Sequence, residues 1–122
     1  MPILYEINRV DGILIVTPID PLEASDFPGL VREVDRDIEE KGKLSGLMIY
    51  AEAFPGWDSF AAFLPQLKFV KNDHLIIRKI AAVTGSGFLS IMPQVANHFV
   101  RAEVRYFDYA DRDVALNWLK TE

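Results

Sequence analysis

Two short polar segments of this chain contain residue types that could accept or bind a phosphate. Asp58 and Ser59 stand at the expected start of a helix, directly before an apolar stretch. A phosphate on Ser59 would lie against free backbone N–H groups and the positive end of the helix dipole. The simpler interpretation is that Asp58 or Ser59 only caps the helix.

The second segment is Gly85-Ser86-Gly87, which follows a predicted strand and precedes a predicted helix. This is the right place for phosphate capture by backbone N–H groups. The segment lacks the Walker lysine and the fuller dinucleotide-binding glycine pattern, so a plain connecting loop is the alternative interpretation. Ligands of parallel α/β sheets favour the carboxyl ends of the strands, and both polar segments should lie there.

Aromatic residues are concentrated around the two segments. Five of them fall within 16 residues, namely Phe54, Trp57, Phe60, Phe63 and Phe69, and Phe88 follows the glycine loop. Helices that cover a sheet need apolar stripes, so part of this set must be core. The residues in turns are less certain to be buried, and they predict an apolar pocket or docking surface. The predicted surface consists of Phe54, Trp57, Asp58, Ser59, Phe60, Ser86 and Phe88. We expect its rings to converge, to be partly exposed and to be covered by a ligand or a neighbouring chain.

No catalytic or metal-binding constellation is visible. The chain has no cysteine, and its two histidines, His74 and His98, are 24 residues apart with no third ligand placed near either. The acidic residues of residues 35–40 have the pattern of a solvated helix face; they are Asp35, Asp37, Glu39 and Glu40. We therefore predict no enzymatic activity, no metal and no cofactor.

Composition indicates an ordinary globular domain. The 122 residues fit one domain spanning 1–122, and half of them are hydrophobic. A net charge of −5 makes nucleic acid a poor default partner. Lys68, Lys71, Arg78 and Lys79 could form a local basic patch, although solvated lysines are the simpler interpretation. No signal peptide is visible and no apolar run reaches the roughly 18–20 residues of a membrane span, so we expect a cytoplasmic protein that is not integral to a membrane.

Hydrophobic periodicity predicts an α/β fold with the order ββαβαβαβα. Strands are expected over 3–8, 13–17, 44–53, 76–84 and 104–107, and helices over 27–41, from 58 or 59 to 67, 89–100 and from 108 or 111 to 119. Alternation of strands and helices favours a mainly parallel five-stranded sheet, with one antiparallel edge strand added by a hairpin at Asp11-Gly12. The expected core is Leu14, Val16, Leu30, Val34, Leu47, Ile49, Ile80, Ala82, Val95, Phe99, Val104, Phe107 and Trp118.

This element order resembles the STAS-type fold, and particular segments resemble its SpoIIAA-like branch, which is related in shape to CRAL-TRIO lipid-binding domains. The similar segments are 17–20 (Thr-Pro-Ile-Asp), 54–57 (Phe-Pro-Gly-Trp), 78–83, 102–107 and 115–119. In the classical antagonists of this fold, the pattern Asp-Ser-Ser/Thr-Gly carries the phosphorylated residue. Here the matching positions read Asp58-Ser59-Phe60-Ala61, so the acceptor position holds a phenylalanine. The resemblance implies a regulatory or ligand-binding domain without the usual phosphoserine.

Two functions remain open at this point. The domain could hold an apolar or amphipathic, lipid-like small molecule between its second and third helices. Alternatively, the same surface could dock a partner protein or a second copy of the chain, and surplus aromatic residues favour a homodimer. Nothing in the sequence specifically supports a third class, an enzyme.

Overall fold

The computed structural model describes residues 3–8, 10–20, 23–41, 44–52, 56–63, 66, 77–99 and 102–121. Its strands are β1 (Ile3–Asn8), β2 (Ile13–Pro18), β3 (Gly46–Ala51), β4 (Lys79–Thr84) and β5 (Glu103–Asp108). Its α-helices are α1 (Phe27–Lys41), α2 (Trp57–Phe63), α4 (Met92–His98) and α5 (Arg112–Lys120), and short 3₁₀ segments include η3 (Ser86–Ser90) and η4 (Tyr109–Asp111). The five strands and four helices confirm the predicted fold class.

The five strands form one mixed sheet in the order β1-β2-β3-β4-β5. β1 and β2 pair antiparallel, with Ile3 opposite Pro18 and Asn8 opposite Ile13. All other neighbouring strands pair parallel. The predicted hairpin is therefore confirmed, and it makes β1 one edge of the sheet.

The turn of this hairpin depends on local hydrogen bonds. The side-chain oxygen of Asn8 accepts hydrogen bonds from the backbone N–H groups of Val10 and Asp11. Gly12 then takes a φ of 67°, a left-handed conformation that glycine adopts without steric penalty. Its N–H donates to the carbonyl oxygen of Asn8, which closes the turn.

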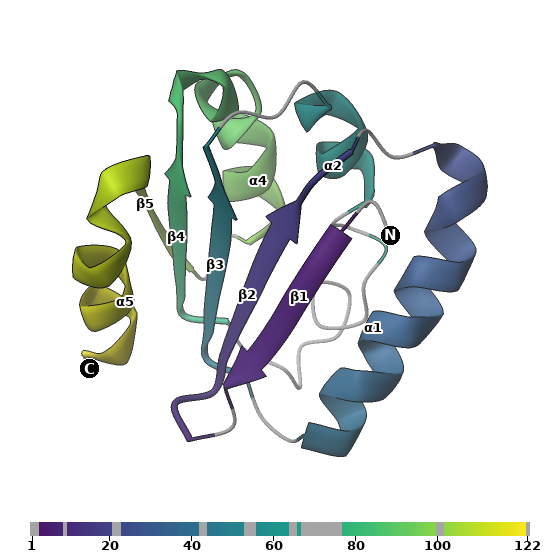
Figure 1. Cartoon of the computed structure of the whole chain (residues 1–122), viewed down its shortest axis with the longest axis horizontal. Helices are drawn as coiled ribbons and strands as arrows, with labels where there is room; N and C mark the ends of the chain where they lie inside the picture. The colour runs from purple at the N-terminus through teal and green to yellow at the C-terminus, as the bar shows by residue number, and fades with distance from the viewer. Residues whose placement is uncertain are drawn as a thin grey trace.

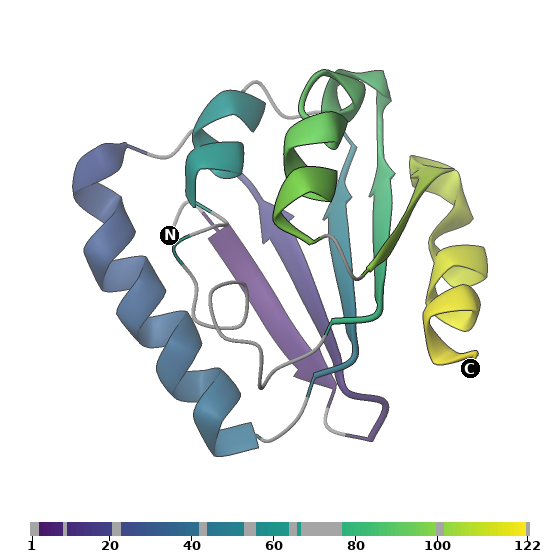
Figure 2. The same ribbon diagram turned by 180° about the vertical axis from the view of Figure 1, so that it is seen from behind.

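Three helices cover one face of the sheet, and α5 covers the other (Figures 1 and 2). Because β2 to β5 run in the same direction and follow one another in sequence order, crossovers of one hand bring α1, α2 and α4 to the same face. α5 follows the last strand and is free of this constraint. Within the described ranges, every helix is too short or too polar to cross a bilayer.

Alternation along the central strands supplies both faces with apolar side chains. On β2, Leu14 and Val16 join the core beneath α1, α2 and α4, whereas Ile13 and Ile15 pack towards α5. All four are buried, which agrees with the near-continuous apolar run in the sequence.

Four expectations about burial need correction. Val104, Phe107 and Trp118 are half-buried rather than buried. β5 is an edge strand, so Val104 lies at the border of the core under α1, α2 and α4, and Phe107 and Trp118 lie at the border of the cluster under α5. Asp35 was expected on a solvated helix face but is buried, with 8% of its surface exposed. α1 lies along the sheet with more of its circumference covered than its charge pattern indicates.

Candidate functional site

Three of the predicted aromatic residues converge at the carboxyl end of β3 and β4. Trp57 opens α2, Phe60 lies one turn later, and Phe88 lies in η3 after β4. The Trp57 ring centroid is 5.7 Å from that of Phe60 and 5.2 Å from that of Phe88, and both contacts are edge-to-face at 82°. Such geometry is favourable for aromatic pairs. The predicted convergence is confirmed for these three rings.

Their predicted partial exposure is wrong. Trp57 is 6% exposed, and Phe60 and Phe88 are fully buried within one copy of the chain. The rings cover one another and join the core beneath α1, α2 and α4. No ligand or neighbouring chain is needed to remove them from water.

Close backbone packing explains the glycine loop. A Cβ on Gly85 would lie 2.7 Å from the carbonyl oxygen of Glu52, closer than two non-bonded atoms approach. A Cβ on Gly87 would lie 3.2 Å from the indole nitrogen of Trp57. The two glycines therefore let η3 approach β3 and α2, which supports the plain-loop interpretation over phosphate capture.

The polar members of the predicted surface have mixed positions. Asp58 is exposed in the first turn of α2. Ser59 is half-buried, and its hydroxyl donates to the carbonyl oxygen of Gly56 at 2.9 Å. Because α2 begins at Trp57, neither residue stands before the helix as predicted. Phe54 and the side chain of Ser86 lie outside the described residues. Of the predicted basic patch, Lys68 and Lys71 also lie outside them, whereas Arg78 and Lys79 are described.

Among the described residues, no group of three His, Asp or Glu side chains could hold a metal ion. His74 lies outside the described part of the chain. His98 ends α4, but its side chain also lies outside it.

On the opposite face, a second aromatic pair covers the carboxyl end of β3. Tyr50 and Tyr109 stack with centroids 4.8 Å apart, and the guanidinium carbon of Arg112 lies 5.3 Å from the Tyr50 centroid. The adjacent Tyr50 side chain is the main cause that raises the pKa of Tyr109. Rings thus pack over this end of the sheet on both of its faces.

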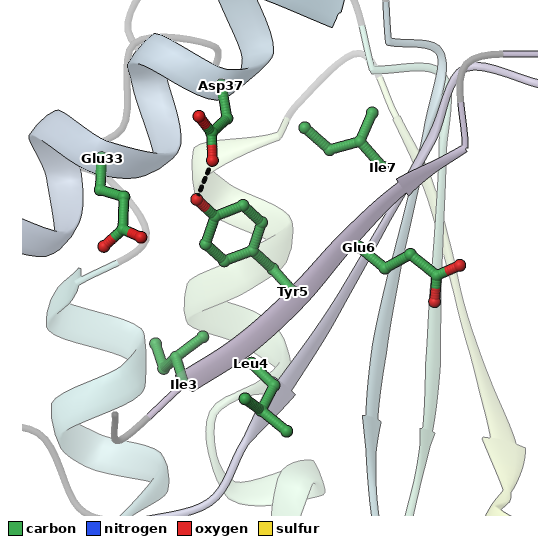
Figure 3. Close-up of a pocket in the computed structure, with 7 residues that line it drawn as sticks. All are labelled: Ile3, Leu4, Tyr5, Glu6, Ile7, Glu33 and Asp37. Carbon is green, nitrogen blue, oxygen red and sulfur yellow. Dashed lines mark hydrogen bonds between the residues drawn. The ribbon is translucent and has the colours of Figure 1, made fainter.

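Sequence reasoning missed a groove along the open edge of β1, shown in Figure 3. Its volume is about 420 Å³, and it is lined by residues 3–7 of β1 and by Glu33 and Asp37 of α1. The Tyr5 hydroxyl donates to the Asp37 carboxylate and so joins the strand to the helix. Burial is the main cause that raises the pKa of Tyr5, helped by that hydrogen bond and by the charges of Asp37 and Glu33. The spacing of Glu33 and Asp37, one helical turn apart, was the available signal.

Comparison with known proteins assigns the chain at the level of a family. The family model described as SpoIIAA-like matches residues 13–120, which is nearly the whole chain. Neither the curated proteins nor the solved structures gave a match.

Proposed function

Because the chain belongs to the SpoIIAA-like family, we propose that it is a non-enzymatic regulatory module that acts by binding another protein. The observation that carries this proposal is the burial of the aromatic residues at the carboxyl end of the sheet. Trp57, Phe60 and Phe88 pack against one another and are buried, so these rings offer no exposed apolar surface to a ligand. A surface supported by rigid packing suits docking better than it suits uptake of a lipid-like molecule.

Exposed side chains on the same two elements supply the contact surface. Leu89 is 49% exposed in η3, directly after the buried Phe88. Asp58 is exposed in α2, directly after the buried Trp57. The buried rings of Trp57 and Phe88 contact each other, so α2 and η3 lie next to each other at one end of the sheet. Figure 1 shows α2 at this end. A partner with complementary apolar and basic groups would fit this surface.

We do not expect this domain to use the phosphoserine switch of the classical antagonists. Phe60 occupies the acceptor position, lacks a hydroxyl and is fully buried. The neighbouring Ser59 hydroxyl donates to the Gly56 carbonyl oxygen. Control of partner binding would therefore depend on something other than phosphorylation at this turn.

Cross-linking in the producing cells tests the surface. We expect the wild-type protein to yield a discrete cross-linked complex that Leu89→Asp abolishes. The matched control is Val114→Asp, which places the same charge on an apolar residue that is 59% exposed on α5, and which should leave the complex unchanged. Retention of the complex by Leu89→Asp would contradict the proposal, as would equal loss in both variants.

The same experiment tests the expected homodimer. Burial of the three rings removes the reason from which a dimer was predicted, so we expect the cross-linked species to contain a different protein. A complex with twice the mass of the chain, lost in Leu89→Asp, would instead identify the partner as a second copy.

A further inference from the structure

The outer edge of β1 has hydrogen-bonding groups available for another strand. β1 pairs with β2 along all six of its residues. No strand of the described residues pairs with its opposite edge, since β1 is the first strand of the sheet order. In an antiparallel pair, alternate residues direct their N–H and C=O groups away from the partner. Such an edge is a template for addition of an extended segment.

The groove lies along this same edge and is lined by β1 and by two residues of α1 (Figure 3). Alternate residues of β1 point to the two faces of the sheet, so Ile3 and Tyr5 face α1 whereas Leu4 and Glu6 face the other side. Ile3 is buried, but Leu4 is 54% exposed. An added strand would therefore find an apolar contact at Leu4 and a helix wall on the side of Tyr5.

The charge of the groove indicates which kind of segment it would bind. Three carboxylates line it, those of Glu6, Glu33 and Asp37, and none of the described lining residues is a lysine or arginine. One cation of α1, Arg36, is near enough for its charge to act on Tyr5, so the carboxylates outnumber the described cations here by three to one. The whole chain carries a net charge of −5, so a second copy would bring its own carboxylates to the same edge. Like charges placed opposite one another oppose that pairing. A segment rich in lysine or arginine would instead neutralise the carboxylates.

We propose that this groove binds an extended basic segment of another protein, which adds to the edge of β1 as a further strand. Basic side chains of the segment lie between β1 and α1 against Glu33 and Asp37, and alternate apolar side chains pack on Leu4. This site is separate from the surface of Asp58 and Leu89, so its existence does not depend on the function proposed above.

A short synthetic strand provides the probe. The peptide alternates lysine and valine over about eight residues, a usual strand length, and both of its ends are blocked. Fluorescence anisotropy should show saturable binding that weakens as salt increases. A peptide with glutamate in place of lysine should not bind. NMR amide shifts caused by the lysine peptide should concentrate in residues 3–8.

Two changes separate strand addition from unspecific attraction of a basic peptide. Glu33→Lys should weaken binding about tenfold. Glu39→Lys, which makes the same charge change six positions along α1 on another face of the helix, should change it less than about twofold. N-methylation of the peptide at alternate residues removes backbone donors and should abolish binding in only one of the two possible registers.

Four results would overturn the proposal. The first three are equal weakening by Glu33→Lys and Glu39→Lys, full binding by peptides N-methylated in either register, and amide shifts that map to α2 and η3 instead of β1. Dimerisation of the free protein through β1 would also overturn it, because the occupant would then be a second copy of the chain.

Discussion

The buried aromatic residues at the end of the sheet are part of what holds the domain together. Trp57 contacts both Phe60 and Phe88, and Gly87 allows its ring to close against η3. A residue in this position contributes through packing, so its truncation should leave a cavity.

Trp57→Ala should therefore destabilise the fold by about 3–5 kcal/mol. Urea unfolding followed by circular dichroism measures the effect, and Leu89→Ala on the exposed side of η3 is the control, with a change within about 0.5 kcal/mol. A Trp57→Ala protein as stable as the wild type would show that the ring is not part of the core.

Ser59 should remain unmodified by a kinase of the kind that phosphorylates classical antagonists. Its hydroxyl donates to the Gly56 carbonyl oxygen, and the family's acceptor position is the buried Phe60. Intact-mass measurement after incubation with such a kinase should show no added phosphate. Stoichiometric phosphate on Ser59 would reverse this conclusion.

Tyr5 gives the fold a specific sensitivity to alkaline pH. Its pKa is raised from the ordinary 10.0, mainly by burial, so the folded state retains the proton more strongly than the unfolded state does. The stabilisation is fully present below pH 10 and is lost as the pH rises above it, because the unfolded chain then releases the proton first.

Tyr5→Phe should accordingly lose less stability than the wild type between about pH 9 and about pH 11. Urea midpoints measured across this range provide the comparison. Tyr106→Phe is a suitable control, since that hydroxyl donates to the Thr84 carbonyl oxygen. Parallel pH curves for wild type and Tyr5→Phe would refute the assignment.

At the scale of elements, α5 is the sole helix among the described residues that covers the second face. Lys79 of β4 fixes its end: the ammonium group donates to the carbonyl oxygens of Trp118 and Thr121 at 3.0 and 2.8 Å, and to the Thr121 hydroxyl at 2.7 Å. A cation at these terminal carbonyl groups also interacts favourably with the negative end of the helix dipole. The Lys79 ammonium lies 5.1 Å from the Trp118 ring centroid, which adds a cation–π contact.

Lys79→Met should weaken the attachment of α5 by about 1–3 kcal/mol. Hydrogen exchange should show faster exchange in 112–121, with little change in α1. Lys120→Met is the matched control, because the Lys120 ammonium makes only a 3.6 Å pair with Asp11 among the contacts seen, at the surface. Equal exchange rates in both variants would contradict a clamping role for Lys79.

Much of the arrangement of elements could be predicted from sequence. The helix over 27–41 has the bounds expected from its apolar spacing, and the hairpin follows from Asp11-Gly12. Helix α4 is shorter than predicted, because the residues after Gly85 first form a 3₁₀ segment. Burial at the site could not be predicted, since it depends on close approaches such as Gly85 to Glu52. Asp37 lies in a charged stretch that is typical of an exposed helix face. Its contact with Tyr5, which places it at the groove, depends on the fold.

For the whole molecule, two separate surfaces follow from one topology. At the carboxyl end of the parallel strands, buried aromatic rings pack together, and Asp58 and Leu89 beside them in sequence are exposed. The antiparallel hairpin leaves β1 at the edge of the sheet beside acidic residues of α1. These are the two surfaces that we propose for protein partners.

Native mass spectrometry of the protein purified from the cells that produce it tests this central claim most directly. We expect the mass of the chain with no lipid-sized adduct, because Trp57, Phe60 and Phe88 are buried against one another without a ligand. A stoichiometric lipid-sized adduct that is lost on denaturation would contradict the account. It would establish instead that the domain holds a small molecule.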